Sequence, residues 1–166
     1  AIHGLFERLP ALAPAARAEA AETWLTRIAR IDDPREREAL ARHVLDIVDH
    51  PDFAAIFSPD ALAEAPIAAV VDGAVIAGTV DRLLVLPDRI QVIDFKTGRF
   101  VPERSDAVPT PHVRQMAAYA AALEVIFPGR PVEAALLYTA QPRLITLPAA
   151  LLDAHKPGFV ATQDNL

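Results

Sequence analysis

Apolar residues recur at helical spacing through the first fifty residues of the chain. In the stretch DDPREREALARHVLDIVDHP, Leu40, Val44 and Ile47 fall on one helix face, and Asp33 precedes it as a helix cap. The stretch PAARAEAAETWLTRIAR is similarly amphipathic, and the opening AIHGLFERLP also fits a helix. This region is therefore predicted to form three helices.

The pattern then changes to alternation in IAAVVDGAVIAGTVDRLLVLPDRIQVIDFKTG, which is rich in Val and Ile. Turn signals at Asp72-Gly73 and Pro87-Asp88 divide this segment, and Asp-Gly between two apolar runs is typical of a hairpin. We expect three consecutive antiparallel strands, at about 65–72, 75–86 and 90–96.

A charged, Pro-rich loop, RFVPERSDAVPTP, follows Gly98 and leads into a predicted helix over 111–127. The stretches VEAALLYTA and RLITL then predict two more strands, and PAALLDAH a short helix. This order predicts an α/β (or α+β) fold with a mixed sheet. We expect one domain over 1–166, with a helical segment over 1–57, a core over 62–154 and a tail over 155–166.

Composition narrows the functional classes. The chain has 166 residues, 52% of them apolar, a mean hydropathy of +0.24, a net charge of −6 and no cysteine. The absence of cysteine excludes disulfides, thiolate catalysis and iron–sulfur clusters. The acidic balance opposes a general DNA-binding module, but not a metal-dependent nuclease, because bound divalent ions invert the local charge.

The chain shows no signal peptide and no apolar run of membrane-spanning length, so we expect a cytoplasmic protein without a membrane partner. It opens without Met and within a predicted helix, and we expect it to be a fragment of a longer protein.

Charged residues interrupt the predicted strands in a way that a core would not favour. Asp94 and Lys96 are two apart and therefore point to the same face of one strand. Asp81 lies in the preceding strand, and counting outward from the turn places it close to a cross-strand pairing with Asp94. On the next helix, Gln115 and Tyr119 are four apart and share a face.

Two interpretations fit these residues. An Asp-x-Lys pair alone is more often an ion-paired strand edge than a catalytic site. Two carboxylates on one sheet face, however, repel each other and are costly to bury unless a cation neutralises them. A divalent metal with oxygen ligands, Mg²⁺ or Mn²⁺, is a natural solution, and Lys96 could orient water or stabilise charge on a phosphate.

The segments GTVDRLLV, VIDFKTGR and RQMAAYAAAL resemble, in order and approximate spacing, the PD-(D/E)XK nuclease superfamily in its RecB-like branch. The resemblance is nearest to the nuclease domains of AddA-type subunits, which belong to UvrD/Rep-type helicase–nucleases for double-strand-break repair. It implies a restriction-endonuclease-like core with helices on both sides of the sheet. It also implies DNA as substrate, an AddB-like partner subunit, and ATP bound only in motor domains outside this chain.

The resemblance also implies roles for single residues. Asp81, Asp94, His3 and the carbonyl of Phe95 would hold the metal, and Lys96 would be the catalytic lysine. Gln115 and Tyr119 match the motif after the catalytic strand and would contact DNA or support the site. Separately from the resemblance, we expect local cations to guide the strand, namely Arg82, Arg99, Arg104 and Arg114. Glu64 occupies the place of a family glutamate, although an ordinary acid near a strand start explains it nearly as well. The other histidines, His43, His50, His112 and His155, are expected to be structural or surface residues.

Three hypotheses of function follow. The first is a metal-dependent nuclease domain that hydrolyses single-stranded DNA within an ATP-dependent helicase–nuclease, with a stand-alone RecB-family exonuclease as a variant. The second is a nuclease-like module that only binds DNA or couples to a partner. The third is a generic α/β domain whose acids form ordinary salt bridges.

Overall fold

The computed structural model describes residues 2–157, so the predicted tail lies outside the described residues from position 158 onward. Three helices come first, as predicted: α1 (Ile2–Arg8), α2 (Pro14–Arg27) and α3 (Pro34–Val48). Short 3₁₀ turns follow α1 and α3, at η1 (Leu9–Ala11) and η2 (Pro51–Phe53). Asp33 caps α3 by accepting a hydrogen bond from the backbone N–H of Arg35.

A five-stranded mixed sheet follows, in the order β1-β2-β3-β4-β5. Its strands are β1 (Leu62–Val71), β2 (Ala74–Val85), β3 (Ile90–Lys96), β4 (Val132–Tyr138) and β5 (Arg143–Leu147). All neighbouring pairs are antiparallel except β3 and β4, which are parallel and are joined through η3 (Ser105–Ala107) and α4 (Thr110–Ile126). A short helix, α5 (Ala149–Asp153), closes the described chain. The predicted mixed sheet and its antiparallel meander are confirmed.

Strand β1 begins three residues before the predicted start, and it contains Pro66. Proline cannot donate a ladder hydrogen bond, so a strand with an internal proline belongs at the edge of a sheet. Within residues 2–157, β1 is indeed an edge strand, since β2 is the only strand that pairs with it.

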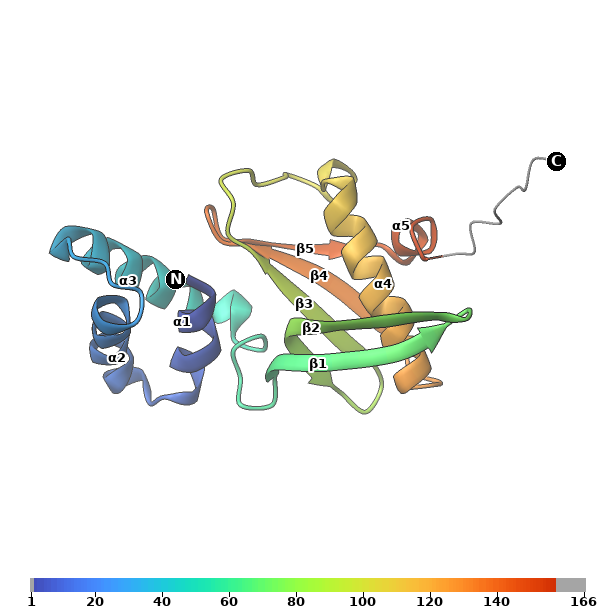
Figure 1. Ribbon diagram of the computed structural model, residues 1–166, viewed down its shortest axis with the longest axis horizontal. Helices are drawn as coiled ribbons and strands as arrows, with labels where there is room; N and C mark the ends of the chain where they lie inside the picture. Colours follow the sequence, from blue (N-terminus) through green and yellow to red (C-terminus); the bar gives the residue numbers. More distant parts are fainter. Residues whose placement is uncertain (1, 158–166) are drawn as a thin grey trace.

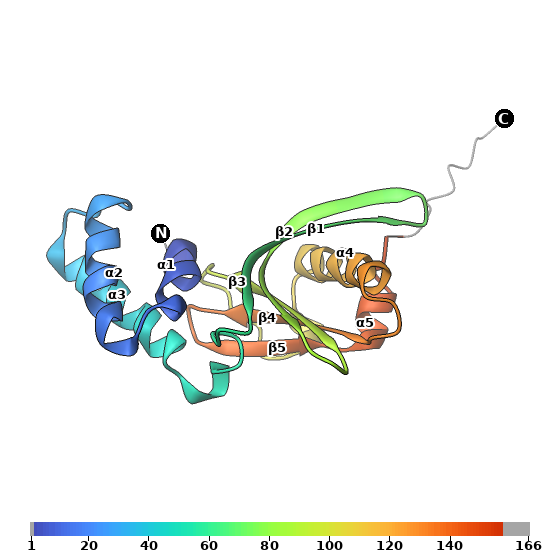
Figure 2. The same ribbon diagram turned by 90° about the horizontal axis from the view of Figure 1, so that it is seen from below.

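The sheet curves around α4. Figure 1 shows α4 crossing in front of the strands, and Figure 2 shows the β1–β2 hairpin arching over one side of α4 while β3, β4 and β5 lie on the other. A buried apolar cluster fills this space, with Met116, Ala120 and Leu123 of α4 against Val92 and Leu136 of the sheet. The opposite face of the sheet carries a second cluster, formed with α1, α2 and α3. Helices therefore cover both faces of the sheet, as expected.

Strand β2 changes the face that it presents to α4 at residue 81. Before this point Ile76 and Val80 pack in the cluster around α4, whereas after it Leu83 does. The β1–β2 pairing skips the opposed positions of Glu64 and Asp81, and Glu64 has a left-handed backbone with φ of 47°. Since side chains alternate along a regular strand, this irregular step is what reverses the facing.

Arg82 ties the helical segment to the sheet, and its expected role as a DNA guide is wrong. Its guanidinium is buried, donates to the backbone carbonyls of Phe6 and Ala61, and lies 5.5 Å from the centroid of the Phe57 ring. A side chain that is 3% exposed and bonded to main-chain carbonyls is not available to a phosphate. Position 82 of β2 faces α1, and the alternating sequence pattern alone did not reveal this.

We predict that Arg82→Met lowers the free energy of unfolding by about 2–4 kcal/mol, because it leaves buried carbonyls without donors. Urea unfolding at neutral pH measures this difference. Arg104→Met is the matched control, since Arg104 is exposed and pairs only with Asp106, and it should change stability by less than about 0.5 kcal/mol. Equal effects of the two substitutions would contradict the structural role of Arg82.

Candidate active site

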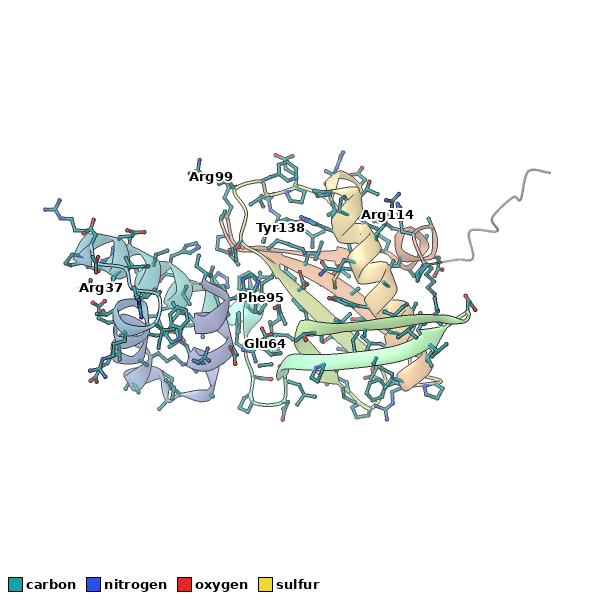
Figure 3. The ribbon with its side chains drawn as sticks, viewed as in Figure 1. Arg37, Glu64, Phe95, Arg99, Arg114 and Tyr138 are labelled. Atoms are coloured by element: carbon teal, nitrogen blue, oxygen red, sulfur yellow. The ribbon has the colours of Figure 1, made fainter. Side chains whose placement is uncertain are left out.

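Three carboxylates lie side by side on neighbouring strands. Glu64 of β1 and Asp81 of β2 are opposed where the β1–β2 pairing skips a step, and the β2–β3 register places Asp94 of β3 next to Asp81. The β2–β3 ladder ends at Arg82 and Ile93, so Asp81 stands at the point where the two strands separate. In Figure 3, Glu64 lies close to where α1 approaches the strands.

Two of these carboxylates, Asp94 and Glu64, have surroundings that raise their pKa. Burial raises the pKa of Asp94, and the charge of Asp81 raises it further, although the hydrogen bond and charge of Lys96 oppose the change. Burial also raises the pKa of Glu64, again with help from the charge of Asp81. The three acids therefore form a strained negative group that a cation would relieve.

Lys96 is the cation that the structure places against this group. Its Nζ lies 2.7 Å from Oδ2 of Asp94 and donates to Oε1 of Gln115, also at 2.7 Å. Gln115 donates in turn to the hydroxyl of Tyr119 at 3.4 Å, and that hydroxyl donates to the carbonyl of Thr79 at 3.4 Å. The predicted face of α4 thus holds the lysine in place through a chain of contacts that returns to β2.

Gly78 makes room for this series of contacts, and it was not among the site residues predicted from the sequence. A Cβ atom at position 78 would lie 2.9 Å from Cε1 of Tyr119, closer than a real Cβ contact. The signal was present in the sequence, because a glycine inside a predicted strand often marks a close approach of another group.

His3 reaches the same place from α1. Its Nε2 lies 3.2 Å from the carbonyl oxygen of Phe95 and 3.7 Å from Oδ2 of Asp81. The interaction with the carboxylate of Asp81 raises the pKa of His3, although partial burial opposes the increase. Asp81 also accepts the backbone N–H of Phe95, so residue 95 contacts both side chains through its main chain.

The chemistry of these donors fits a hard divalent cation. Ligands of an octahedral ion at about 2.1 Å are about 3 Å apart, which is close to the spacing of His3 Nε2 from the oxygens of Phe95 and Asp81. In the described part of the chain, no three His, Asp or Glu side chains already converge on one point. Asp94 is turned toward Lys96 and Asp81 toward the N–H of Phe95, so the ligands would have to turn from these partners to a metal.

The other predicted cations lie farther from the carboxylates. Arg114 is exposed on α4, and Arg99 extends from the loop that follows β3 (Figure 3). Arg104 is held by Asp106 in the same loop. Of the remaining histidines, His50 accepts the backbone N–H of Asp52, and His112 contacts Tyr138 near the end of β4.

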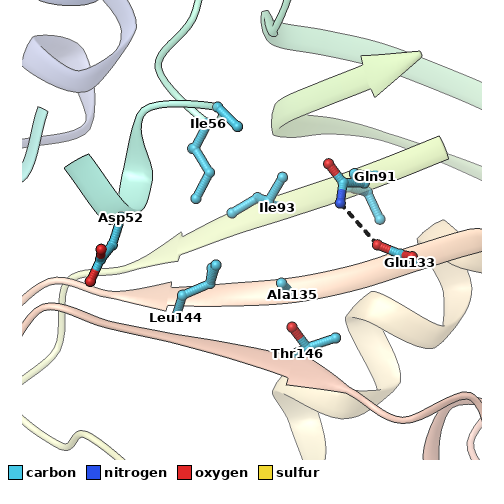
Figure 4. A pocket seen from close by; sticks show the side chains of 10 residues that line it. Asp52, Ile56, Gln91, Ile93, Glu133, Ala135, Leu144 and Thr146 are labelled. Carbon is cyan, nitrogen blue, oxygen red and sulfur yellow. Dashed lines mark hydrogen bonds between the residues drawn. The ribbon is translucent and has the colours of Figure 1, made fainter. Parts of the chain in front are cut away.

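A small hollow on the opposite face of the sheet, of about 130 Å³, does not belong to this site. Figure 4 shows it between Asp52, Ile56 and the strands β3, β4 and β5, with Gln91 donating to Glu133 at 2.9 Å. Two acids, Asp52 and Glu133, and no basic side chain of the described residues line it. It therefore lacks the lysine that accompanies the carboxylates of the site above, and it has no positive charge to bind a phosphate.

The geometry above agrees with a comparison against protein families. The model of the PD-(D/E)XK nuclease superfamily matches residues 1–163. The chain belongs to this superfamily. It is therefore a member of a group of phosphodiester-hydrolysing nucleases that generally use divalent metal ions, and DNA is the substrate that such a nuclease domain implies.

A solved structure has a similar fold. A protein from Eubacterium rectale, provisionally described as an exonuclease, superimposes with a TM-score of 0.54 at 12% identity, over 87% of this chain and 62% of that chain. The chain of this protein therefore spans less than two thirds of the length of that neighbour. The structure of SSO0001 is less similar, with a TM-score of 0.38 at 18% identity, over 92% of this chain and 70% of that chain. A search of the curated proteins found no significant match.

Every helix among residues 2–157 is too short or too polar to cross a lipid bilayer.

We predict that Asp94→Asn stabilises the metal-free nuclease at neutral pH, raising its melting temperature by roughly 2 °C or more. The raised pKa of Asp94 means that the ionised acid is less favourable in the folded protein than in the unfolded chain. The stability due to this proton is fully present below the unfolded pKa and is lost as the pH rises through the folded pKa. Asparagine removes that loss while keeping an oxygen for Lys96.

Thermal unfolding in EDTA across a pH series measures this effect. The advantage of asparagine should shrink as the pH falls and wild-type Asp94 takes up its proton. Asp46→Asn, at an exposed position of α3, is the matched control and should leave the melting temperature at neutral pH unchanged. An Asp94→Asn protein less stable than the wild type at neutral pH would contradict the prediction.

A second prediction concerns the space at Gly78. Gly78→Ala should lower the free energy of unfolding by about 1–3 kcal/mol, because the new Cβ displaces the ring of Tyr119. In a Tyr119→Ala background, where the ring is absent, the same substitution should cost much less. Urea unfolding of the four proteins gives the coupling energy, and a coupling near zero would show that Tyr119 does not depend on Gly78.

Proposed function

We propose that the chain is the nuclease domain of a helicase–nuclease, and that it hydrolyses phosphodiester bonds of single-stranded DNA. One observation carries this proposal: the ammonium nitrogen of Lys96 lies 2.7 Å from oxygens of both Asp94 and Gln115, and the neighbouring carboxylate, that of Asp81, is approached by His3. A salt-bridged strand edge would need only the first of these contacts.

The proposed metal ligands are Asp81, Asp94, His3 and the carbonyl of Phe95, with Glu64 as a further carboxylate beside Asp81. Bound Mg²⁺ or Mn²⁺ would supply Lewis-acid chemistry, polarising the phosphate and making water more acidic. The protein's own contribution is to hold these oxygen and nitrogen donors at the point where β2 leaves β3.

Lys96 is the proposed catalytic lysine. Its ammonium group can orient a water molecule or stabilise the negative charge that develops on a phosphate oxygen. The amide oxygen of Gln115 holds the ammonium group independently of Asp94, so the lysine keeps a partner when Asp94 turns from it to a metal. Tyr119 supports Gln115 and is thereby a positioning residue.

The acidic net charge suits a domain that receives DNA from other components of a larger machine. In that arrangement, motor domains outside this chain would bind ATP, and an AddB-like subunit would be the partner. Exposed Arg99 and Arg114 would guide the strand locally.

We predict that Mg²⁺ or Mn²⁺ raises the melting temperature of the wild type and that Asp94→Ala removes this shift. At a metal concentration about 100 times the dissociation constant, the stabilisation should be about 2.7 kcal/mol. Cleavage of end-labelled single-stranded DNA in Mn²⁺ provides the second measurement. Lys96→Ala should abolish cleavage while largely sparing the metal-induced shift.

Asp46→Ala is the control, since it removes an exposed acid of α3 and should leave both measurements unchanged. No metal-induced shift and no cleavage by the wild type would overturn the proposed function. Cleavage that survives Lys96→Ala would overturn the role given to the lysine alone.

A further inference from the structure

A hollow of about 370 Å³ lies beside Lys96, on the side away from Glu64 and Asp81. It is formed where β3 ends, where the following loop turns, and where α4 and β4 come closest to that loop. The side chains used in the argument below are Lys96, Arg99, Phe100, His112 and Tyr138. Its volume is within the range of sites that hold small molecules.

Phe100 is an unusual residue for this loop. It is 60% exposed although it is large and apolar, and it lies on the rim of the hollow. An aromatic ring held at the surface beside cations offers a platform on which a nucleobase can stack. Burial in a core does not account for its presence, because the ring belongs to neither apolar cluster.

The charge of the hollow suits a phosphate. Lys96 and Arg99 line it, and no acidic side chain does. Among the described residues, Arg99 forms no ion pair, whereas Arg104 of the same loop is held by Asp106. A guanidinium left free at the rim of a cavity can contact the backbone of a nucleic acid.

The inner wall is polar but uncharged. His112 Nδ1 lies 3.0 Å from the hydroxyl of Tyr138, and this contact fixes both rings. Burial, followed by the charge of Asp94, raises the pKa of Tyr138 to about 12, so its hydroxyl keeps its proton at neutral pH. Burial and the charge of Lys96 lower the pKa of His112, which favours the neutral imidazole. Neutral donors and acceptors of this kind suit a sugar.

We propose that this hollow is a nucleotide subsite for single-stranded DNA. It takes the nucleotide next to the bond held at Lys96, with its base stacked on Phe100 and its phosphate against Arg99. A base within a duplex is already stacked on its neighbours, so the subsite selects a strand whose bases are free. This inference rests on the proposed function and adds to it the residues that choose the substrate.

The test is equilibrium binding of a short fluorescent single-stranded oligonucleotide, in Ca²⁺, with the oligonucleotide shown to remain intact. Phe100→Ala should weaken binding about 5- to 150-fold, as expected for the loss of one stacked base, and Phe100→Trp should retain it. Arg99→Ala should weaken binding and reduce the slope of log affinity against log salt by about one phosphate contact. Because both side chains are exposed, neither substitution should lower the melting temperature.

Two controls sharpen the result. Val75→Ala removes another exposed apolar side chain, 75% exposed, at the far end of the β1–β2 hairpin, and should leave affinity unchanged. Oligonucleotides with one abasic position, moved along the strand, should bind the wild type less well at a single position. At that position Phe100→Ala should cause little further loss, because the stacked base is already missing.

The outcomes separate this inference from the proposed function. If the wild type cleaves DNA but Phe100→Ala binds within twofold of it, the subsite is wrong and the nuclease stands. If Phe100→Ala weakens binding equally at every abasic position, the ring does not stack one base and the subsite is again wrong. If the wild type neither binds nor cleaves single-stranded DNA, the proposed function itself fails.

Discussion

Repulsion among three carboxylates on neighbouring strands is the constraint around which the rest of the fold is arranged. Glu64, Asp81 and Asp94 come together where β1, β2 and β3 would otherwise form a regular sheet. Like charges at this spacing are tolerated only with compensation, and each acid receives it differently. Asp94 has the ammonium of Lys96, and Asp81 has the N–H of Phe95 together with His3. At Glu64 the irregular backbone step interrupts the β1–β2 pairing. The acids therefore lie where the strands separate and not within a regular part of the sheet.

The helical segment of the chain has a defined relation to this junction. Arg82 holds the end of α1 through the carbonyl of Phe6, and Gly4 brings α1 so close to Trp24 that a Cβ would lie 2.5 Å from the indole ring. His3 directly precedes Gly4 in the first turn of the same helix. A histidine near the start of a short helix would be poorly placed without these contacts, since helices of this length are not stable alone. The buried arginine therefore supports the site, although it never contacts it.

Much of the fold could be predicted from the sequence because its signals are local. The Asp72-Gly73 turn, the alternation of Val and Ile, and the helix after the Pro-rich loop each depend on neighbouring residues. The near pairing of Asp81 with Asp94 followed from counting outward from a turn. The reversal of facing at residue 81 could not be predicted, because an alternating pattern contains no mark for a skipped pair. The burial of Arg82 was missed for the same reason, since its partners at positions 6 and 61 are distant in sequence.

The parallel pairing of β3 and β4 has a consequence for how such a domain can diversify. Parallel neighbours need a long crossover, and here the crossover begins with the loop that carries Arg99 and Phe100 before the chain enters α4. Surface loops tolerate insertions and exchanges at small cost, whereas the strands that hold Asp94 and Lys96 do not. Changes in loop length or composition can thus alter the proposed subsite while the proposed reacting groups stay in place. The proposed chemistry and the proposed selectivity are assigned to adjacent but separable segments, which makes the region after residue 97 the natural place for engineering.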